Sequence, residues 1–498
     1  MKILKNILIL FLGMSVVFSC TDLETELLDS EAGADANNEF IKYTEDRALE
    51  FLQSSYNSLA TFTDQNNIYA LGTHTSDELI PPTRGVDWGD NGVWRTLHAH
   101  NWDATHASVL GAWNNIHQNA FATNGIIFSD VSAETDAAAR FMRAFYTYHA
   151  MDMFGQVPFR EVTDGPDVDP KVFSRTEAFD FIISDLETAL PHLPSIGPSP
   201  TNAQASKATA NYLLAKMYLN KAVYFADNPA GPYTFDNADM DRVIEHVDAI
   251  TADGYSLDPD FFNVFTANES PEIIFTSPNG SGQNRWMMTL HYDQNPSGWN
   301  GFTTLADFYN KFEDQDSRIG QEAAKDGSEF GGIGKGFLIG QQFTRNGDIL
   351  IDSRSQKPLQ FTPEVPLAGA ATEKGIRAIK YHPADHGQYI LMRYADAYLM
   401  KAEALFRKGE TSEALDMVNN LRSIRGASTL NSLDESILLD ERGRELYWEG
   451  YRRTDQIRFG TFTDTWDHKS VTDEFRVLYP IPSIAVASNP NLEQNPGY

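Results

Sequence analysis

The chain has 498 residues, 42% of them hydrophobic and 12% aromatic, which is enough apolar material for a large folded core. Its 69 Asp and Glu residues outweigh 39 Lys and Arg residues, and the formal net charge of -30 argues against nucleic acid as a partner. Because the chain has one cysteine, Cys20, no intramolecular disulfide can form and stability must come from packing.

The first twenty residues have the pattern of an export signal. A short basic start precedes an apolar stretch from Ile7 to Phe18, which is too short to span a membrane. The stretch Val16 to Cys20 resembles a bacterial lipobox. We therefore predict that residues 1–19 are a lipoprotein signal peptide and that Cys20 becomes an acylated N-terminus, anchoring the protein to a membrane. A plain secretion signal with an incidental cysteine is the alternative.

The segment that follows the cysteine is polar and acidic. Residues 20–38 are predicted to form a solvated tether between the lipid and the folded part of the protein. No second apolar stretch of membrane-spanning length follows. We expect residues 39–498 to form a single body, with a repeat-rich N-terminal part at 39–255 and a C-terminal part at 256–498.

The body alternates between helical segments rich in Ala, Leu and charge and irregular segments rich in Gly, Asn, Trp and Pro. Apolar residues recur at helical spacing, and polar caps, Gly or Pro mark several ends. Thr411 is expected to cap one helix and Gly426 to end it. The spacing predicts helices over residues 109–130, 134–154, 179–193, 205–225, 241–252, 389–408, 411–424 and 433–458.

Two pairs of these helices have the character of helical hairpins. The stretch 393–425 places small residues such as Ala402 and Ala414 where two antiparallel helices would meet, as in a tetratricopeptide repeat, and 205–254 offers a looser pair. A lone hairpin cannot bury its apolar face, so the remaining helices are expected to complete the solenoid. The pattern predicts a mainly α fold.

Three blocks stand out along the body. They are AAARFMRAFYTYHAMDMFGQVP at Ala137–Pro158, ERGRELYWEGYRRTDQIRFG at Glu441–Gly460 and LYPIPSIAVASNPNLEQNPGY at Leu478–Tyr498. As a set and in this order they resemble the signatures of the SusD/RagB family, nutrient-binding outer-membrane lipoproteins of Bacteroidetes. The resemblance implies a SusD-like fold, in which a tetratricopeptide-type hairpin scaffold carries long irregular insertions that form the ligand face. It also implies a SusC-like TonB-dependent transporter as partner in the cell outer membrane.

Two irregular segments, Thr73–Thr105 and Ser277–Trp299, are predicted to form the ligand face. They contain five of the 8 tryptophans of the chain. The C–H face of a pyranose ring packs flat on indole, while Asn, Asp and Arg hydrogen-bond its hydroxyl groups. The expected ligand-binding residues are Arg84, Asp87, Trp88, Trp94, Asn101, Trp102, Asn284, Arg285, Trp286, Tyr292, Trp299 and Asn300.

Each of these tryptophans has a second interpretation, which the sequence leaves open. A large aromatic side chain in a long loop also serves to anchor the loop to the scaffold. Trp113 lies within a helical pattern and Trp448 within the block Glu441–Gly460, so both are expected in the core.

We expect the protein to be a non-catalytic surface protein that binds an oligosaccharide or polysaccharide and delivers it to the transporter. The alternatives are a peptide-binding, RagB-like member of the same family and, from another class, a surface glycosidase. Glu441, Glu445 and Glu449 offer paired carboxylates, as a glycosidase requires. Their spacing of four and the arginines between them instead predict one face of a salt-bridged helix.

No metal or cofactor is expected. His98, His100 and His106 lack a compelling ligand spacing, and the acidic cluster at 313–316 is expected to be solvated or to cap a turn. The glycine-rich segment 331–336 has no Ser or Thr after its lysine, so we expect a flexible surface loop and no phosphate-binding loop.

Overall fold

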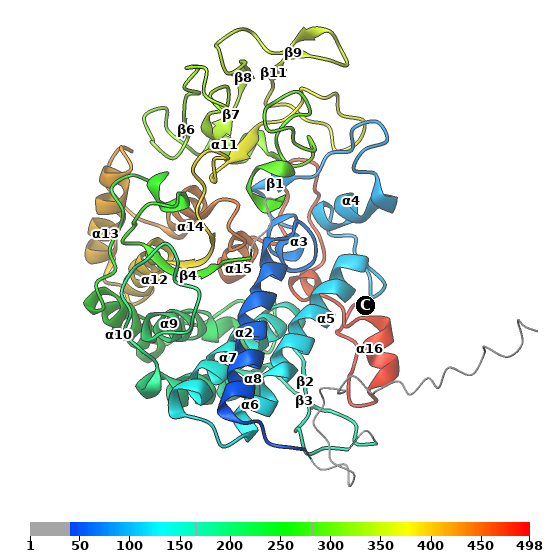
Figure 1. Cartoon of the computed structure of the whole chain (residues 1–498), viewed down its shortest axis with the longest axis vertical. Coiled ribbons are helices and arrows are strands. Elements are labelled where there is room, and N and C mark those ends of the chain that lie inside the picture. Colours follow the sequence, from blue (N-terminus) through cyan, green and yellow to red (C-terminus); the bar gives the residue numbers. More distant parts are fainter. Residues whose placement is uncertain (1–39, 166, 280–282) are drawn as a thin grey trace, which may run out of the picture.

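The computed structural model describes residues 40–165, 167–279 and 283–498. The predicted signal peptide, Cys20 and the tether therefore lie outside the described residues. Helices make up the lower and left parts of the molecule, and short strands joined by long loops gather at its upper end (Figure 1). Within the described ranges, no helix combines the length and apolarity needed to cross a membrane.

The helices fall into two sequence halves. Those of the first half are α2 (Glu45–Asn57), α3 (Asn67–Thr73), α4 (Val93–His98), α5 (Ala107–Ala122), α6 (Asn124–Phe128), α7 (Ala133–Phe154), α8 (Arg175–Ala189), α9 (Lys207–Tyr224) and α10 (Asn237–Ala252). Those of the second half are α11 (Ala306–Tyr309), α12 (Tyr394–Arg407), α13 (Thr411–Ile424), α14 (Glu435–Leu446), α15 (Arg452–Arg458) and α16 (Ser483–Ser488).

The strands are short and pair in antiparallel fashion. They are β1 (Leu79–Ile80), β2 (Val157–Phe159), β3 (Lys171–Phe173), β4 (Ile273–Ser277), β5 (Thr303–Thr304), β6 (Gly320–Gln321), β7 (Lys335–Leu338), β8 (Gly340–Gln341), β9 (Ile351–Asp352), β10 (Lys357–Pro358), β11 (Gln360–Phe361), β12 (Arg377–Ile379) and β13 (Tyr389–Arg393). Their sheets have the orders β12-β7-β6, β1-β5, β2-β3, β4-β13, β8-β11 and β9-β10.

The predicted helical hairpins are present. Helix α9 packs on α10 and α12 packs on α13, and the contact of α10 with α12 joins the two pairs. Local signals mark the ends of the neighbouring helices α7 and α8. A reciprocal cap between Ser174 and Glu177 begins α8, and Gly155, with a positive φ of 74°, ends α7. The mainly α, hairpin-based fold is confirmed, whereas the division of the body at residue 255 stays a prediction.

Several helix boundaries differ from the prediction: the helix expected over 109–130 is divided into α5 and α6, and α8 and α10 begin about one turn early. Residues Tyr389–Arg393 are not helical: they pair with β4, with Ile390 opposite Thr276, before α12 begins. This segment is largely buried, and a buried apolar run of this length suits a strand as well as a helix. Thr411 is the first helical residue of α13, and the cap position belongs to Glu410, whose side chain makes no capping bond.

The helix predicted over residues 433–458 is divided into α14 and α15. Trp448 and Gly450 between them have positive φ angles of 59° and 84°, which a continuous right-handed helix excludes. Glu449 therefore does not share a helix face with Glu441 and Glu445, as the spacing of four predicted.

The prediction of a flexible loop at 331–336 is wrong. Lys335 begins β7, the central strand of a three-stranded sheet. A Cβ atom at Gly336 would lie 2.3 Å from the backbone oxygen of Ile319, so glycine is needed there for close backbone packing. The glycines of this segment allow chains to approach rather than provide mobility.

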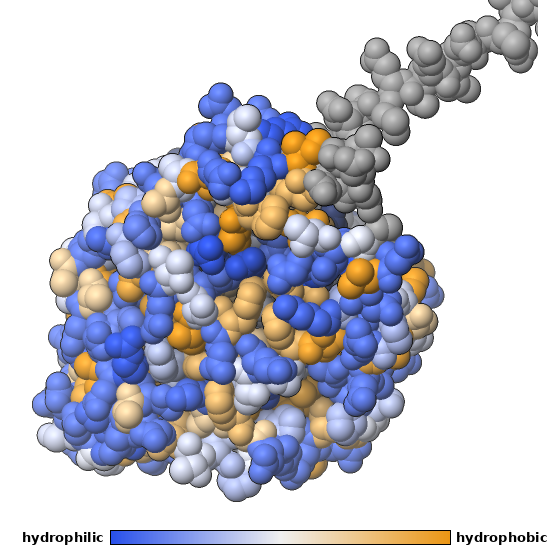
Figure 2. Space-filling model, turned by 90° about the horizontal axis from the view of Figure 1, so that it is seen from below, coloured by the Kyte–Doolittle hydropathy of each residue, from blue (hydrophilic) through white to orange (hydrophobic). Residues whose placement is uncertain are grey.

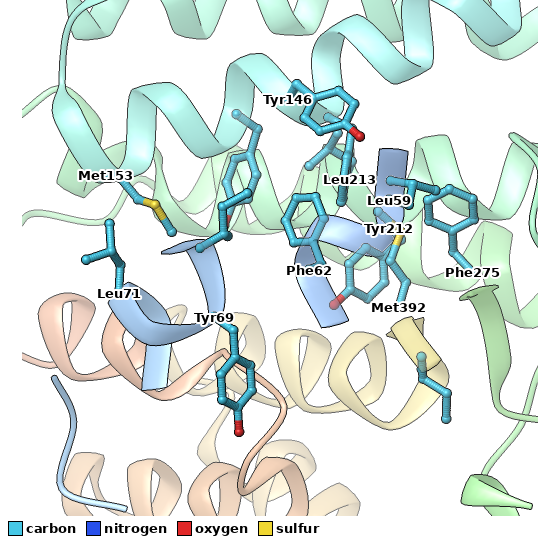
Figure 3. Packing of buried hydrophobic residues seen from close by; sticks show 14 of the residues in the cluster. Leu59, Phe62, Tyr69, Leu71, Tyr146, Met153, Tyr212, Leu213, Phe275 and Met392 are labelled. Atoms are coloured by element: carbon cyan, nitrogen blue, oxygen red, sulfur yellow. The ribbon is translucent and has the colours of Figure 1, made fainter. Parts of the chain in front are cut away.

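The main core lies where the N-terminal helices meet β4 and β13. Side chains from the 3-10 turn Ser58–Thr63, from α3, α7 and α9 and from both strands point toward one another there (Figure 3). The labelled members are Leu59, Phe62, Tyr69, Leu71, Tyr146, Met153, Tyr212, Leu213, Phe275 and Met392. Full burial of each apolar side chain stabilises the fold by roughly 1.5–3 kcal/mol.

Buried ion pairs tie the second signature block to the rest of the scaffold. Glu445 is inaccessible to solvent and is within 3.1 Å of Arg318, 2.9 Å of Arg393 and 2.8 Å of Arg425. Glu441 likewise pairs with arginines from outside its helix as well as with Arg444. The predicted salt bridges exist, but they are buried and link separate elements instead of stabilising one exposed helix face.

These carboxylates predict a loss of stability in acid. Burial alone would raise their pKa values, but the facing arginines lower the pKa of Glu441 to about 2. Glu403 of α12, which pairs with Arg407 and Arg458, likewise has its pKa lowered to about 2. Since the folded pKa lies below the unfolded value near 4.5, the stabilisation is present above pH 4.5 and is lost as pH falls toward 2, by roughly 3 kcal/mol per group. Urea unfolding followed by circular dichroism at pH 7, 5, 4 and 3 should show this decline. Constant stability between pH 4.5 and 3 would contradict it.

The outer surface is mainly polar. On the face shown in Figure 2, hydrophilic residues predominate and apolar side chains form separate patches. Exposed large apolar residues of the described chain include Ile41, Phe121, Phe128, Val168 and Ile484. Isolated exposed apolar residues are normal in folded proteins, so this face by itself does not identify a binding site.

Candidate ligand-binding site

The two predicted insertions meet in space because strands pair next to them. Strand β1 pairs with β5, with Leu79 opposite Thr304. Residues that follow β1 are therefore placed beside residues that precede β5. The first insertion supplies the turn Arg84–Asp87 and α4, and the second supplies the loop from Tyr292 to Asn300.

Three tryptophans from these segments and Phe302, which directly precedes β5, form an aromatic cluster. The Trp88 ring centroid lies 4.7 Å from that of Phe302, 5.8 Å from that of Trp94 and 6.3 Å from that of Trp299. The Trp88 indole N–H donates to the backbone oxygen of Trp299 at 3.0 Å. A Cβ atom at position 301 would lie 2.4 Å from the Trp88 ring, so Gly301 makes room for the indole.

The members of the cluster differ in exposure. Trp94 is 4% exposed, and its indole N–H donates to Asp90 at 2.6 Å, so it supports the cluster from inside. Trp88 and Trp299 are only partly buried. Trp88 also has a positive φ of 61°, an unfavourable conformation for a bulky residue that must be held by its surroundings. These two indoles form the open part of the cluster.

A phenol and a pair of charges continue this surface. The Tyr292 hydroxyl donates to Asp87 Oδ2 at 2.7 Å, and burial followed by this hydrogen bond raises the pKa of Tyr292. The guanidinium of Arg354 lies 4.0 Å from the Tyr292 ring centroid and 3.4 Å from Asp87 Oδ2. We call Trp88, Trp299, Tyr292, Asp87 and Arg354 the aromatic platform. It offers flat rings beside a charged donor and a charged acceptor.

Arg84 and Asn300 lie behind this platform and are buried. Arg84 donates to the backbone oxygen of Lys374 at 2.7 Å, and the Asn300 amide donates to that of Thr372 at 3.0 Å. Arg377 in turn donates to Asn300 Oδ1 at 2.6 Å. Arg84 and Asn300, which the sequence predicted as ligand contacts, therefore hold the loop around residues 371–375 in place. Their side chains are not available to a ligand in this structure.

Trp286 and Arg285 belong to a different place. They lie on the π-helical turn Gln283–Met287, where the Trp286 ring centroid is 4.8 Å from that of His386. Arg285 is 6% exposed and lies 3.2 Å from His386 Nδ1. Neither contacts the aromatic platform through any described interaction, and the side chain of Asn284 lies outside the described residues.

Trp102 is an anchor and has no free surface. It is 1% exposed, and its indole N–H donates to the hydroxyl of Tyr498, which donates to the backbone oxygen of Leu478. Asn101 beside it is exposed but is not joined to the platform by any described contact. The expected core positions of Trp113 and Trp448 are confirmed, at 6% and 7% exposure.

The three histidines of the first insertion do not converge on a metal. His98 bonds to the backbone oxygen of Asp467 at 3.0 Å and His100 to that of Thr75 at 2.8 Å. His106 caps α5 by accepting from the Ser108 backbone N–H. Each histidine therefore has a separate structural role.

Arg354 belongs to the platform but was not among the ligand-binding residues expected from the sequence. It lies between β9 and β10, more than fifty residues beyond the second insertion, in a polar turn without aromatic residues. No local pattern distinguishes it from other exposed arginines, and only its position over Tyr292 indicates a role.

The helical-hairpin scaffold with aromatic loops defines a tetratricopeptide-like class of helical protein. The SusD family model matches residues 268–498 of this chain, which supports its membership of that family. It is 26% identical over 417 residues to the starch-binding protein SusD of Bacteroides thetaiotaomicron, covering 73% of this chain and 72% of that one. It is 24% identical to the SusD-like protein P38 of Formosa agariphila over 100% of both chains.

Solved structures support the fold. A SusD superfamily protein from Parabacteroides distasonis superposes with a TM-score of 0.70 at 19% identity, covering 92% of this chain and 100% of that one. The surface glycan-binding protein A from Bacteroides thetaiotaomicron in complex with laminarihexaose gives a TM-score of 0.65 at 18% identity, covering 91% and 100%. The expected SusD-like fold is thereby confirmed.

Proposed function

We propose that this protein is a non-catalytic, lipid-anchored protein of the outer-membrane surface, which binds an oligosaccharide or polysaccharide and delivers it to a SusC-like TonB-dependent transporter. The observation that carries the proposal is the aromatic platform, in which the partly buried rings of Trp88, Trp299 and Tyr292 lie beside Asp87 and Arg354. No cofactor is needed for this function.

The platform suits a sugar chain on physical grounds. Indole and phenol faces pack against the apolar C–H face of a pyranose, and each contact adds about 0.5–1.5 kcal/mol beyond the area that it buries. Rigid aromatic rings lose little rotamer freedom on binding. Asp87 accepts and Arg354 donates hydrogen bonds, which is what sugar hydroxyl groups require at the edge of such a stack.

The relatives support the same ligand class. One is named a starch-binding protein, and two of the matching solved structures are a laminarin-binding SusD-like protein and a surface glycan-binding protein with a bound laminarihexaose. The ligands named for these three proteins are all glycans. This agreement favours a glycan over a peptide for the present platform.

The carboxylates of the second signature block support binding without catalysis. Glu441 and Glu445 are both 0% exposed, and arginines occupy their oxygen atoms. A glycosidase needs two carboxyl groups that reach the sugar from either side of the scissile bond. These two cannot act in that way.

Isothermal titration calorimetry of the purified protein against a panel of polysaccharides, oligosaccharides and peptides tests the proposal. We expect saturable binding of one glycan class, without release of reducing ends. Binding of peptides alone would replace the proposal with the RagB-like function, and release of sugar would replace it with a glycosidase. Binding only in the presence of the transporter would assign the site to the complex.

Removal of the acylation site tests the anchor separately. Cys20→Ala should move nearly all of the protein from the membrane fraction to the soluble fraction, because a thioether-linked lipid can then no longer form. Ser19→Ala, which keeps the cysteine, is the matched control and should remain in membranes. Immunoblots of fractionated cells measure both, and equal membrane retention of the two variants would overturn the lipoprotein assignment.

A further inference from the structure

Next to the platform, three side chains of types that can bind a metal ion lie close together, although they come from two distant segments. One imidazole nitrogen of His291 and one carboxylate oxygen from each of Asp293 and Asp352 are all within 4.8 Å of one another. His291 Nδ1 is 3.5 Å from Asp293 Oδ2. Among the described residues, this is the one group of three or more such side chains close enough to share an ion.

One nitrogen of this imidazole has no partner. His291 is 0% exposed; its Nδ1 accepts from the backbone N–H of Asp293 at 3.2 Å, whereas its Nε2 atom is buried without any hydrogen-bond partner. Leaving a buried polar atom unpaired is unfavourable, so the unpaired Nε2 atom indicates an absent ligand. A metal ion would bind to an imidazole nitrogen that carries no proton.

The charges that face the ring are of both signs. Arg377 and Arg84 disfavour a cation there, whereas Asp352 and Asp293 favour one. Both arginines donate terminal N–H groups to backbone oxygens around residues 371–375, and neither pairs with a described carboxylate. The two carboxylates remain as the negative charge that is available to an ion.

Surrounding groups hold the carboxylates in position. Asp352 accepts from the backbone N–H of Arg354 at 2.9 Å and from the hydroxyls of Ser355 and Thr372 at 2.8 and 2.6 Å. Asp293 accepts from the backbone N–H of Ser353 at 2.8 Å. Such second-layer hydrogen bonds orient metal ligands and tune their affinity. Asp293 also lines an open cleft of about 240 Å³, through which an ion can enter.

We propose that His291, Asp293 and Asp352 bind one divalent transition-metal ion of the Zn²⁺ type. One imidazole and two carboxylates match the ligands of Zn²⁺ and its neighbours, whereas Ca²⁺ and Mg²⁺ prefer oxygen ligands alone. Ligands at about 2.1 Å in a tetrahedron are about 3.4 Å apart, so the group must contract on binding. Three protein ligands leave a fourth position for water.

The ion would join two loops that also carry the aromatic platform. Tyr292 lies between two of the ligands, and Arg354 follows the third by two residues. Binding would therefore fix the Tyr292 ring relative to Arg354, which now touch through a single ring contact and a shared carboxylate. Metal binding itself needs no glycan, so its test gives a result that does not depend on the proposed function.

The test is calorimetric titration of the full-length, tag-free protein with Zn²⁺ after treatment with EDTA. We expect one ion per chain and little response to Mg²⁺ or Ca²⁺. Asp293→Asn keeps the shape of a partly exposed side chain and should weaken binding at least about tenfold, as should His291→Ala. Asp348→Asn, an exposed aspartate in the neighbouring hairpin, is the matched control and should bind like the parent chain.

Circular dichroism of each variant separates lost binding from lost folding. If His291→Ala does not fold, Asp293→Asn alone decides the matter. The assignment is overturned if the parent chain shows no saturable binding at one ion per chain, or if Asp293→Asn binds as tightly as Asp348→Asn.

Discussion

Replacing Trp299 by alanine should weaken glycan binding about tenfold to a hundredfold and leave the helical circular dichroism unchanged. Trp299 is partly buried and touches the other rings only through Trp88, so its removal takes away a stacking surface without opening the core. The Trp88 hydrogen bond survives because its acceptor is the backbone oxygen of Trp299. The loss corresponds to about 1.4–2.8 kcal/mol, which is the expected value for one aromatic stack together with its buried area.

The matched control is Trp466→Ala. Trp466 is also partly buried, but its ring lies beside Lys469 and His100, outside the aromatic platform. Calorimetry with the glycan identified by the ligand panel measures both variants. Equal losses in the two, or unchanged affinity in Trp299→Ala, would remove the platform as the binding site. Trp94 is less suited to this test, because truncating a buried tryptophan costs about 3–5 kcal/mol of folding stability.

Replacing Glu445 by glutamine should lower the free energy of unfolding by about 3–5 kcal/mol. The side chain pairs with three buried guanidinium groups, those of Arg318, Arg393 and Arg425, which share the remaining carboxylates Asp316, Glu272, Glu441 and Glu449. Glutamine keeps the size of the side chain but removes the negative charge, so the arginines lose their shared counter-ion in a site without solvent. Breaking a buried pair in this way is among the most destabilising single changes.

Urea unfolding at pH 7, followed by circular dichroism, measures this effect. Glu413→Gln on the exposed side of α13 is the matched control, and its unfolding free energy should change by less than about 0.5 kcal/mol. A similar, small change in both variants would show that the network contributes little to stability. Glycan affinity should remain unchanged in any Glu445→Gln protein that stays folded, since the network does not touch the platform.

The sequence predicted most of the helices of the scaffold. The periodicity of α7, α9, α10 and α13 is local, since each helix needs one apolar face and defined ends, and both are properties of neighbouring residues. The three signature blocks were equally informative about the family. Errors arose where local patterns were ambiguous: Tyr389–Arg393 is a strand because β4 is available to pair with it, and the glycines at 331–336 serve packing.

The sequence also located the two loops that form the aromatic platform, because aromatic density is a local property. It did not distinguish the tryptophans within them. Trp102 and Trp299 occur in similar polar loops, yet Trp102 is covered by Tyr498, 396 residues further along the chain, and Trp299 is not. Exposure is set by contacts between distant segments, which composition does not record.

The same reason explains the residues that only the tertiary structure revealed. Arg354 contributes to the platform, and Asp352 to the proposed metal site, because the hairpin of β9 and β10 folds back over Tyr292 and His291. The sequence by itself determined the helices, the family and the aromatic loops, all of which depend on neighbouring residues. The tertiary structure decided which of their side chains remain exposed, since exposure depends on which distant segments cover them.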